Sequence, residues 1–142
     1  MGNEKNADTA VVCRLISEKL EKCGFRAFRE FSAVDSLIYK NSSIGFYSLK
    51  SCSLAGLAIN HSSLKRVVET DCVFEIRLMG RSCEFADYEE LSAKCDALYR
   101  SLTEDTVFLI RSMEMGKAYQ SMPLKRLTRD LRLNIRLCTE ED

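Results

Sequence analysis

The feature that most constrains the fold is an alternating apolar segment followed by an amphipathic one, within Cys72–Leu102. Over Cys72–Leu78 every even-numbered residue is apolar, whereas Glu75 and Arg77 occupy odd positions. A period of two is typical of a strand whose sheet is covered on one face. The pattern therefore predicts a strand that needs a cover, and this strand can begin as early as Arg66.

The segment that follows can supply this cover as a helix. Asp87 and Glu90 have the spacing of a capping box, so we expect the helix to start at Asp87 and to run to Leu102. Apolar residues at steps of three and four place one stripe along it. The stripe consists of Tyr88, Leu91, Cys95, Leu98 and Leu102. We predict that its Leu91, Cys95 and Leu98 side packs on the preceding strand.

The segments before this unit predict one more helix and several strands. Asp8 can cap a first helix that runs to about Cys23 and is stopped by Gly24. Residues 26–59 are rich in aromatic and β-branched residues and are broken at residues 41–43, Gly45 and Gly56, which indicates two or three strands joined by turns. The phase of the apolar residues slips near Phe46-Tyr47, as at a bulge.

After the second helix, Val107–Ile110 is an unbroken apolar run that suits a strand covered on both faces. Met113–Lys125 is expected to be a mobile loop or a β-arm. Leu131–Cys138 alternates apolar and polar residues and predicts the last strand. The expected fold is α+β: a mixed, mainly antiparallel β-sheet packed by two α-helices in the order α-β-β-β-α-β-β. We expect a single domain over residues 1–142, with loose tails at 1–7 and 139–142.

Composition excludes several classes of protein. The formal net charge is zero, with 21 basic and 21 acidic residues, so there is no global field that would attract nucleic acid. No apolar run approaches the roughly 20 residues that span a bilayer, and the N-terminus lacks the apolar segment of a secretion signal. We therefore expect a cytoplasmic location without a membrane partner.

Catalytic and metal-binding patterns are absent from the sequence. His61 is the single histidine and lies in a polar turn, and there is no glycine-rich phosphate loop. The seven cysteines are odd in number and contain no CxxC pair, which fits neither a disulfide framework nor a zinc finger. Cys72 and Cys95 fall on apolar phases, as small core residues do. We expect no enzyme activity, no cofactor and no metal.

Basic residues gather in the last part of the chain. They are Lys125, Arg126, Arg129, Arg132 and Arg136. One interpretation is an ordinary solvated face, since exposed strand faces are commonly polar. The other is an interface, or a lumen that meets acidic surfaces or passing nucleic acid. Met113 and Met115 are candidates for the same interface, because methionine adapts to irregular contacts, but they can equally fill the core.

The order of elements resembles the tail terminator and tail-completion proteins (minor tail proteins) of long-tailed bacteriophages and prophages. The resemblance covers about residues 8–138 and is carried by the first helix, the Cys72–Leu78 strand, the Tyr88-x-x-Leu91 helix and the final Arg-Leu-Asn-Ile-Arg-Leu strand. It implies a structural protein that forms a ring, a hexamer, on the tail tube and docks the neck of the head.

The implied partners are other copies of the chain, the tail tube protein and the neck or head-completion protein, without sequence-specific nucleic-acid binding. The implied locations are the host cytoplasm during assembly and the virion tail. The sequence departs from the family pattern in the length of the 41–61 region and in its many cysteines. The alternative is a small cytoplasmic α+β module that binds a metabolite or a protein, since fold alone does not separate the two.

Overall fold

The computed structural model describes residues 9–29, 42–104, 108–121 and 125–141. In chain order the elements are α1 (Thr9–Lys22), β1 (Arg26–Arg29), β2 (Ile44–Ile59), β3 (Arg66–Met79), α2 (Phe85–Thr103), β4 (Leu109–Met115), β5 (Tyr119–Ser121) and β6 (Arg126–Glu141). The predicted α+β class and element order are confirmed, and the three-residue β5 is added to them.

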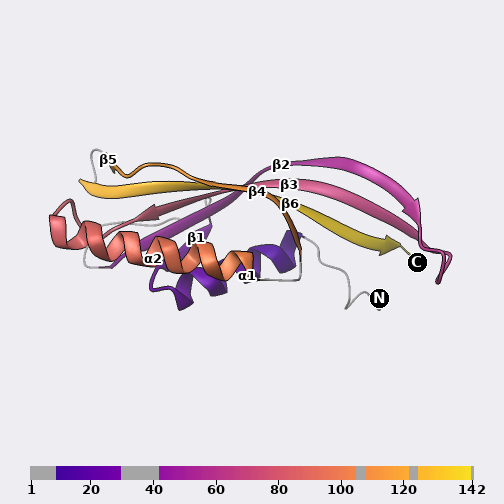
Figure 1. Cartoon of the computed structure of the whole chain (residues 1–142), viewed down its shortest axis with the longest axis horizontal. Coiled ribbons are helices and arrows are strands. Elements are labelled where there is room, and N and C mark those ends of the chain that lie inside the picture. The colour runs from indigo at the N-terminus through magenta and orange to yellow at the C-terminus, as the bar shows by residue number, and fades with distance from the viewer. Residues whose placement is uncertain (1–8, 30–41, 105–107, 122–124, 142) are drawn as a thin grey trace.

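All of the described strands form one sheet. Its order is β1-β2-β3-β6-β4, with β5 also paired to β6. The pair β1–β2 is parallel, and the other strand pairs are antiparallel. Both helices lie on the same side of the sheet, and β2, β3 and β6 curve away beyond them (Figure 1). One part of the sheet is thus covered by helices and another part is not.

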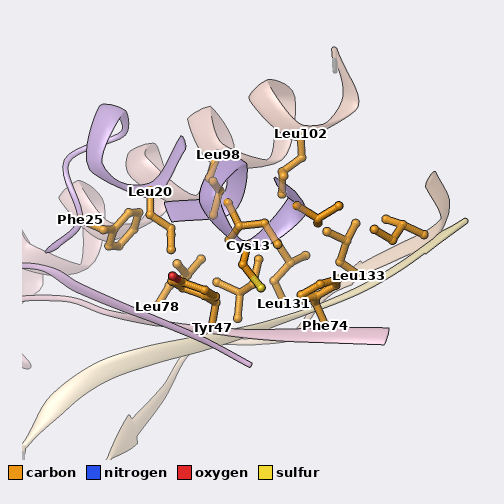
Figure 2. Packing of buried hydrophobic residues seen from close by; sticks show 14 of the residues in the cluster. Cys13, Leu20, Phe25, Tyr47, Phe74, Leu78, Leu98, Leu102, Leu131 and Leu133 are labelled. Carbon is orange, nitrogen blue, oxygen red and sulfur yellow. The ribbon is translucent and has the colours of Figure 1, made fainter. Parts of the chain in front are cut away.

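The core lies between the helices and the covered part of the sheet. Side chains from α1 and α2 point toward those of the strands, with Leu20 and Leu98 on the helix side and Phe74 and Leu131 on the sheet side (Figure 2). The even-numbered residues of β3 from Cys72 to Leu78 are all buried, and so are Leu91, Cys95, Leu98 and Leu102. The predicted stripe of β3, the predicted stripe of α2 from Leu91 onward and the packing of the two on each other are confirmed.

The first helix ends as its sequence predicts. Gly24 has a φ of 97°, the left-handed conformation that glycine adopts at little cost. The amide N–H of Phe25 then donates to the carbonyl oxygen of Leu20 at 2.9 Å, which turns the buried Phe25 ring back onto the helix. The expected cap at Asp8 lies outside the described residues.

The start of α2 differs from the prediction. The helix begins at Phe85 with Glu84 as N-cap, and no side chain of the cap donates or accepts a capping hydrogen bond. The Asp87 carboxylate instead accepts from Ser82 Oγ and from Arg81. The capping box is therefore wrong, because a basic side chain in the preceding turn binds the acid that was expected to cap the helix. Tyr88 is 44% exposed and lies outside the buried stripe.

Several expectations about strands are also wrong. Neither Gly45 nor Gly56 ends β2, and the register is unbroken at Phe46-Tyr47, where a bulge was expected. The register shifts instead between Leu49 and Ser51 and again between Leu54 and Gly56. A bulge absorbs an extra residue without ending the strand. The chain from residue 139 to Glu141 is not a loose tail but part of β6, where it pairs with β3. Residues 1–7 lie outside the described part of the chain.

Two further expectations concern the segment after α2, and the first of them is wrong. Leu109 is 60% exposed because β4 is at the edge of the sheet rather than covered on both faces. Val107 is not among the described residues. The Met113–Lys125 segment, expected as a loop or an arm, begins as the end of β4 and contains β5 on β6. Residues 122–124 lie outside the description.

Candidate assembly surface

The three longest strands extend past the helices as a projection that we call the arm. The arm comprises Ser53–Ile59 of β2, Arg66–Asp71 of β3 and residues 138–141 of β6, with the turn 60–65 at its tip. It lies at the far side of the molecule from the β5 end (Figure 1). The rest of the sheet, together with α1 and α2, is called the body.

The core-facing side of the sheet continues along the arm. Directly opposed residues in an antiparallel pair share a face, and alternate residues of one strand do so too. Cys72 and Phe74 face the core, so Thr70 and Val68 lie on the same face farther out. Three apolar residues of β2 are opposed to even-numbered residues of β3 and therefore share this face. They are Leu54, Leu57 and Ile59.

We call this side of the arm its inner face; it also carries Val68, Thr70 and Arg66 of β3, and its three apolar residues from β2 are exposed. Leu54 is 63% exposed, Leu57 57% and Ile59 61%. Burying one such side chain contributes about 1.5–3 kcal/mol, a gain that the isolated arm does not obtain. Exposed apolar residues gathered on one surface mark a site that binds another protein. The inner face of the arm is thus the strongest candidate binding surface of the described chain.

Neither edge of the arm is paired with another of the described strands. β1 pairs with β2 only as far as Tyr47, and β4 pairs with β6 only as far as Arg136. Beyond these points, no described strand pairs with the outer edge of β2 or of β6. Open edges of this kind can accept a strand from another chain. The arm therefore offers apolar contact and backbone hydrogen bonds together.

The predicted basic group does not form one continuous surface. Arg126 is 4% exposed, and its Nη1 donates to the carbonyl oxygens of Ser42 at 2.7 Å and Gly80 at 3.1 Å. Burial lowers the pKa of its guanidinium. Arg126 thus fastens β6 to two neighbouring segments inside the body. Lys125 is exposed in the turn before β6, with a φ of 55°.

The other three arginines of β6 lie on both faces of the sheet. Arg132 and Arg136 share the open face, opposite the helices, as predicted from the alternation of β6. Arg136 forms two hydrogen bonds to the Asp71 carboxylate, at 2.9 and 3.1 Å, and these lower the pKa of Asp71. Arg132 is opposed to a glutamate on each side, and Arg129 donates to a backbone carbonyl oxygen on the β4–β5 connection. The open face therefore carries mixed charge.

The two candidate methionines pack in the body. Met113 and Met115 are half-buried and contact the hydrophobic core from β4. Their positions are opposed to Leu133 and Leu131, which are core residues of β6. Of the two readings that the sequence left open, the structure places these side chains against the core.

A hollow of about 330 Å³ lies on the open face of the body. Charged and polar side chains contribute most of its lining, and Arg77 Nε donates to Asp130 Oδ1 at 2.9 Å along its wall. The Tyr119 hydroxyl donates to the same carboxylate at 2.9 Å, and its burial together with this bond raises the pKa of Tyr119. This hollow is one of several polar hollows on the described part of the body.

Other candidate sites are sparse in the described ranges. Within them, no group of three histidine, cysteine or acidic side chains is placed to hold a metal ion. His61 is exposed in the turn at the tip of the arm. Neither α1 nor α2 is long and apolar enough to cross a membrane.

Sequence reasoning missed the inner face of the arm. Leu54, Leu57 and Ile59 were within a segment predicted to be strands, and nothing in the prediction set them apart as exposed. One signal in the sequence could have revealed this face. The predicted strands are longer than the two predicted helices can cover, so some apolar strand residues must lie beyond the helices. A helix rises about 1.5 Å per residue and a strand about 3.3 Å. The 14-residue α1 and 19-residue α2 therefore lie beside only part of strands that reach 16 residues.

Comparison with models of known protein families found no match, and comparison with curated proteins found none either. Among solved structures, the chain is similar to a chain from the virion of a native gene transfer agent particle. The TM-score is 0.38 and the sequence identity 15%, over 95% of this chain and 87% of that chain. A TM-score this low does not establish a common fold, so neither fold nor function is inferred from this similarity.

Proposed function

We propose that this chain is a structural, non-catalytic virion-assembly protein of a phage or prophage. In this role it forms a ring that terminates the tail tube and joins the tail to the neck. The observation that carries the proposal is the arm, whose inner face continues the core beyond the helices and leaves Leu54, Leu57 and Ile59 exposed. The resemblance to tail terminator proteins supports the choice of a phage tail.

The arm suits a ring because its surface differs from the surfaces of the body. Contact between two different patches of identical subunits is heterologous, and such contacts close into a ring when the rotation permits. In the ring, the inner face of one arm packs on the body of the next copy. Assembly then takes place in the host cytoplasm, and the ring resides in the virion tail between the tube protein and the neck protein.

Self-association in the presence of tail tube protein tests this function. We expect a monomer or small oligomer alone and rings on tube ends when tube protein is added, measured by light scattering over a range of concentrations and by negative-stain images. Leu57→Ser together with Ile59→Ser should weaken ring formation at least tenfold, since about 1.4 kcal/mol of lost contact gives that factor.

The matched control is Leu109→Ser, which removes an equally exposed leucine from the open face of the body. This variant should still form rings. A tight two-fold dimer that ignores tube protein would contradict the proposal, as would normal capping of tubes by the Leu57→Ser, Ile59→Ser variant.

A further inference from the structure

Two cysteines face each other where the arm joins the body. Cys52 of β2 and Cys72 of β3 are direct partners in the register, and their Sγ atoms are 3.4 Å apart. The segment of β2 that contains Cys52 lies between the two register shifts of that strand. An S–S bond is about 2.05 Å long and needs Cβ atoms about 3.5–4.5 Å apart. Opposed residues of an antiparallel pair approach this separation, so a small movement closes the bond.

The two thiols differ in access to solvent. Cys52 is exposed, whereas Cys72 is fully buried in the core. Burial raises the pKa of Cys72 to about 12, and the hydrogen bond with Cys52 adds to the effect. A dissolved reagent therefore meets Cys52 first. Among the described cysteines, Cys138 is also exposed, but its position on β6 is opposed to Glu69 rather than to a thiol.

We propose that Cys52 and Cys72 form a dithiol site that exchanges with low-molecular-weight disulfides, with Cys52 reacting first and Cys72 closing an intramolecular disulfide. In the first step the Cys52 thiolate attacks one sulfur of the small disulfide. The S–S bond of the reagent breaks, one small thiolate leaves, and a mixed disulfide forms on Cys52.

In the second step Cys72 gives up its proton and attacks the Cys52 sulfur. The second small thiolate then leaves, and the Cys52–Cys72 bond forms. The two cysteines together lose two electrons and two protons, and the reagent gains both as it becomes two thiols. Cys72 is a slow attacking group because its thiolate is disfavoured by burial, so the mixed disulfide on Cys52 should accumulate before the bond closes.

The disulfide would link β2 to β3 covalently at the base of the arm. Residues 52–72 contain all of the β2 and β3 portions of the arm and the turn at its tip. A bond between Cys52 and Cys72 closes this hairpin into a covalent loop. It therefore restricts opening of the two strands at the point where helix cover ends, and reduction restores the free hairpin.

Oxidised glutathione is the probe for the test, applied to the full-length protein and followed by intact mass and tryptic mapping. Cleavage after Lys50, Lys65, Arg66 and Arg77 puts the two cysteines on different peptides, so their bond appears as a cross-linked pair. We expect Cys52 to acquire glutathione at least about tenfold faster than Cys72. The mixed disulfide should then convert to the Cys52–Cys72 cross-link.

Three variants complete the experiment. Cys72→Ala should stop at the mixed disulfide on Cys52, Cys52→Ser should leave Cys72 unmodified, and Cys138→Ser should form the cross-link at the wild-type rate. Should Cys72→Ala fail to fold, the order of modification in the wild-type protein still decides the matter. Equal modification of Cys52 and Cys138 without a Cys52–Cys72 cross-link would overturn the proposal.

Discussion

The body and the arm share the three strands β2, β3 and β6, yet the apolar residues of these strands have opposite environments in the two regions. In the body, Phe74 of β3 and Leu133 of β6 are fully buried beneath the helices. In the arm, Leu57 and Ile59 lie on the same face of the same sheet and are more than half exposed. On this face β2 stays apolar along the arm, although Thr70 and Arg66 of β3 are polar. What decides whether the apolar side chains are exposed is whether a helix lies above the strand.

This comparison teaches that an apolar stripe predicts a need for cover but does not identify the cover. In the body the cover is α1 and α2, and the stripe contributes to folding. In the arm no described residue provides it, and the stripe is free to contribute to association. The same residue type is therefore expected to act on two different equilibria, unfolding in the body and assembly in the arm.

The largest expected effect is on the stability of the body. Leu98→Ala should lower the free energy of unfolding by about 2–5 kcal/mol, because it removes a fully buried side chain from the contact between α2 and the sheet. Leu57→Ala in the arm is the matched control and should change it by about 0.5 kcal/mol or less. Urea unfolding followed by circular dichroism measures both. Equal losses would mean that the arm is covered within the monomer.

A smaller effect is expected for charged residues of β6. Arg126→Ala should cost about 1–3 kcal/mol, because the carbonyl oxygens of Ser42 and Gly80 lose a buried donor. Arg132→Ala removes an exposed arginine from the same strand and should cost about 0.5 kcal/mol or less. The same urea experiment measures the difference. If the two variants were equally stable, Arg126 would not fasten β6 as described.

The smallest expected effect on stability comes from the ion pair between Arg136 and Asp71 at the base of the arm. Hydrogen bonds from Arg136 hold the pKa of Asp71 below its ordinary value of 3.8. A carboxylate with a lowered pKa stabilises the fold above its unfolded-state pKa, and this contribution is lost as the pH falls through the folded-state pKa. Arg136→Gln should therefore be less stable than wild type at neutral pH, and the two should converge in acid.

The measurement for this prediction is an NMR titration of the Asp71 carboxyl group. Its pKa should rise toward 3.8 in Arg136→Gln and stay low in Arg132→Gln, which alters the neighbouring arginine on the same face. An unchanged pKa in Arg136→Gln would assign the shift to other charges.

Much of the body could be predicted from the sequence because its signals are local. The even-numbered face of β3, the odd-numbered face of β6 and the buried stripe of α2 all follow from periodicity, which depends on backbone geometry alone. The end of α1 follows from the freedom of glycine at Gly24. The start of α2 was mispredicted because Arg81, a residue outside the expected motif, binds Asp87.

The candidate surfaces were less predictable because they depend on distant residues. Arg126 belongs to a run of basic residues in the sequence, but the approach of Ser42 and Gly80 buries it. Cys52 carries no motif, and only the register of β2 on β3 brings its sulfur within 3.4 Å of Cys72. Two register shifts separate this segment from the ends of β2. Counting residues along the chain therefore does not reveal the pair.

The sequence by itself determined which elements form and which side of each is apolar, since these properties arise from the backbone repeat and the side chains of one segment. Only the tertiary structure decided where the helices stop covering the sheet. The position of this boundary depends on how far α1 and α2 extend along strands that are longer than the helices. That boundary separates the buried Phe74 from the exposed Leu57. Cys52 and Cys72 lie at the same boundary, which leaves the Cys52 thiol exposed to solvent beside the buried Cys72 thiol.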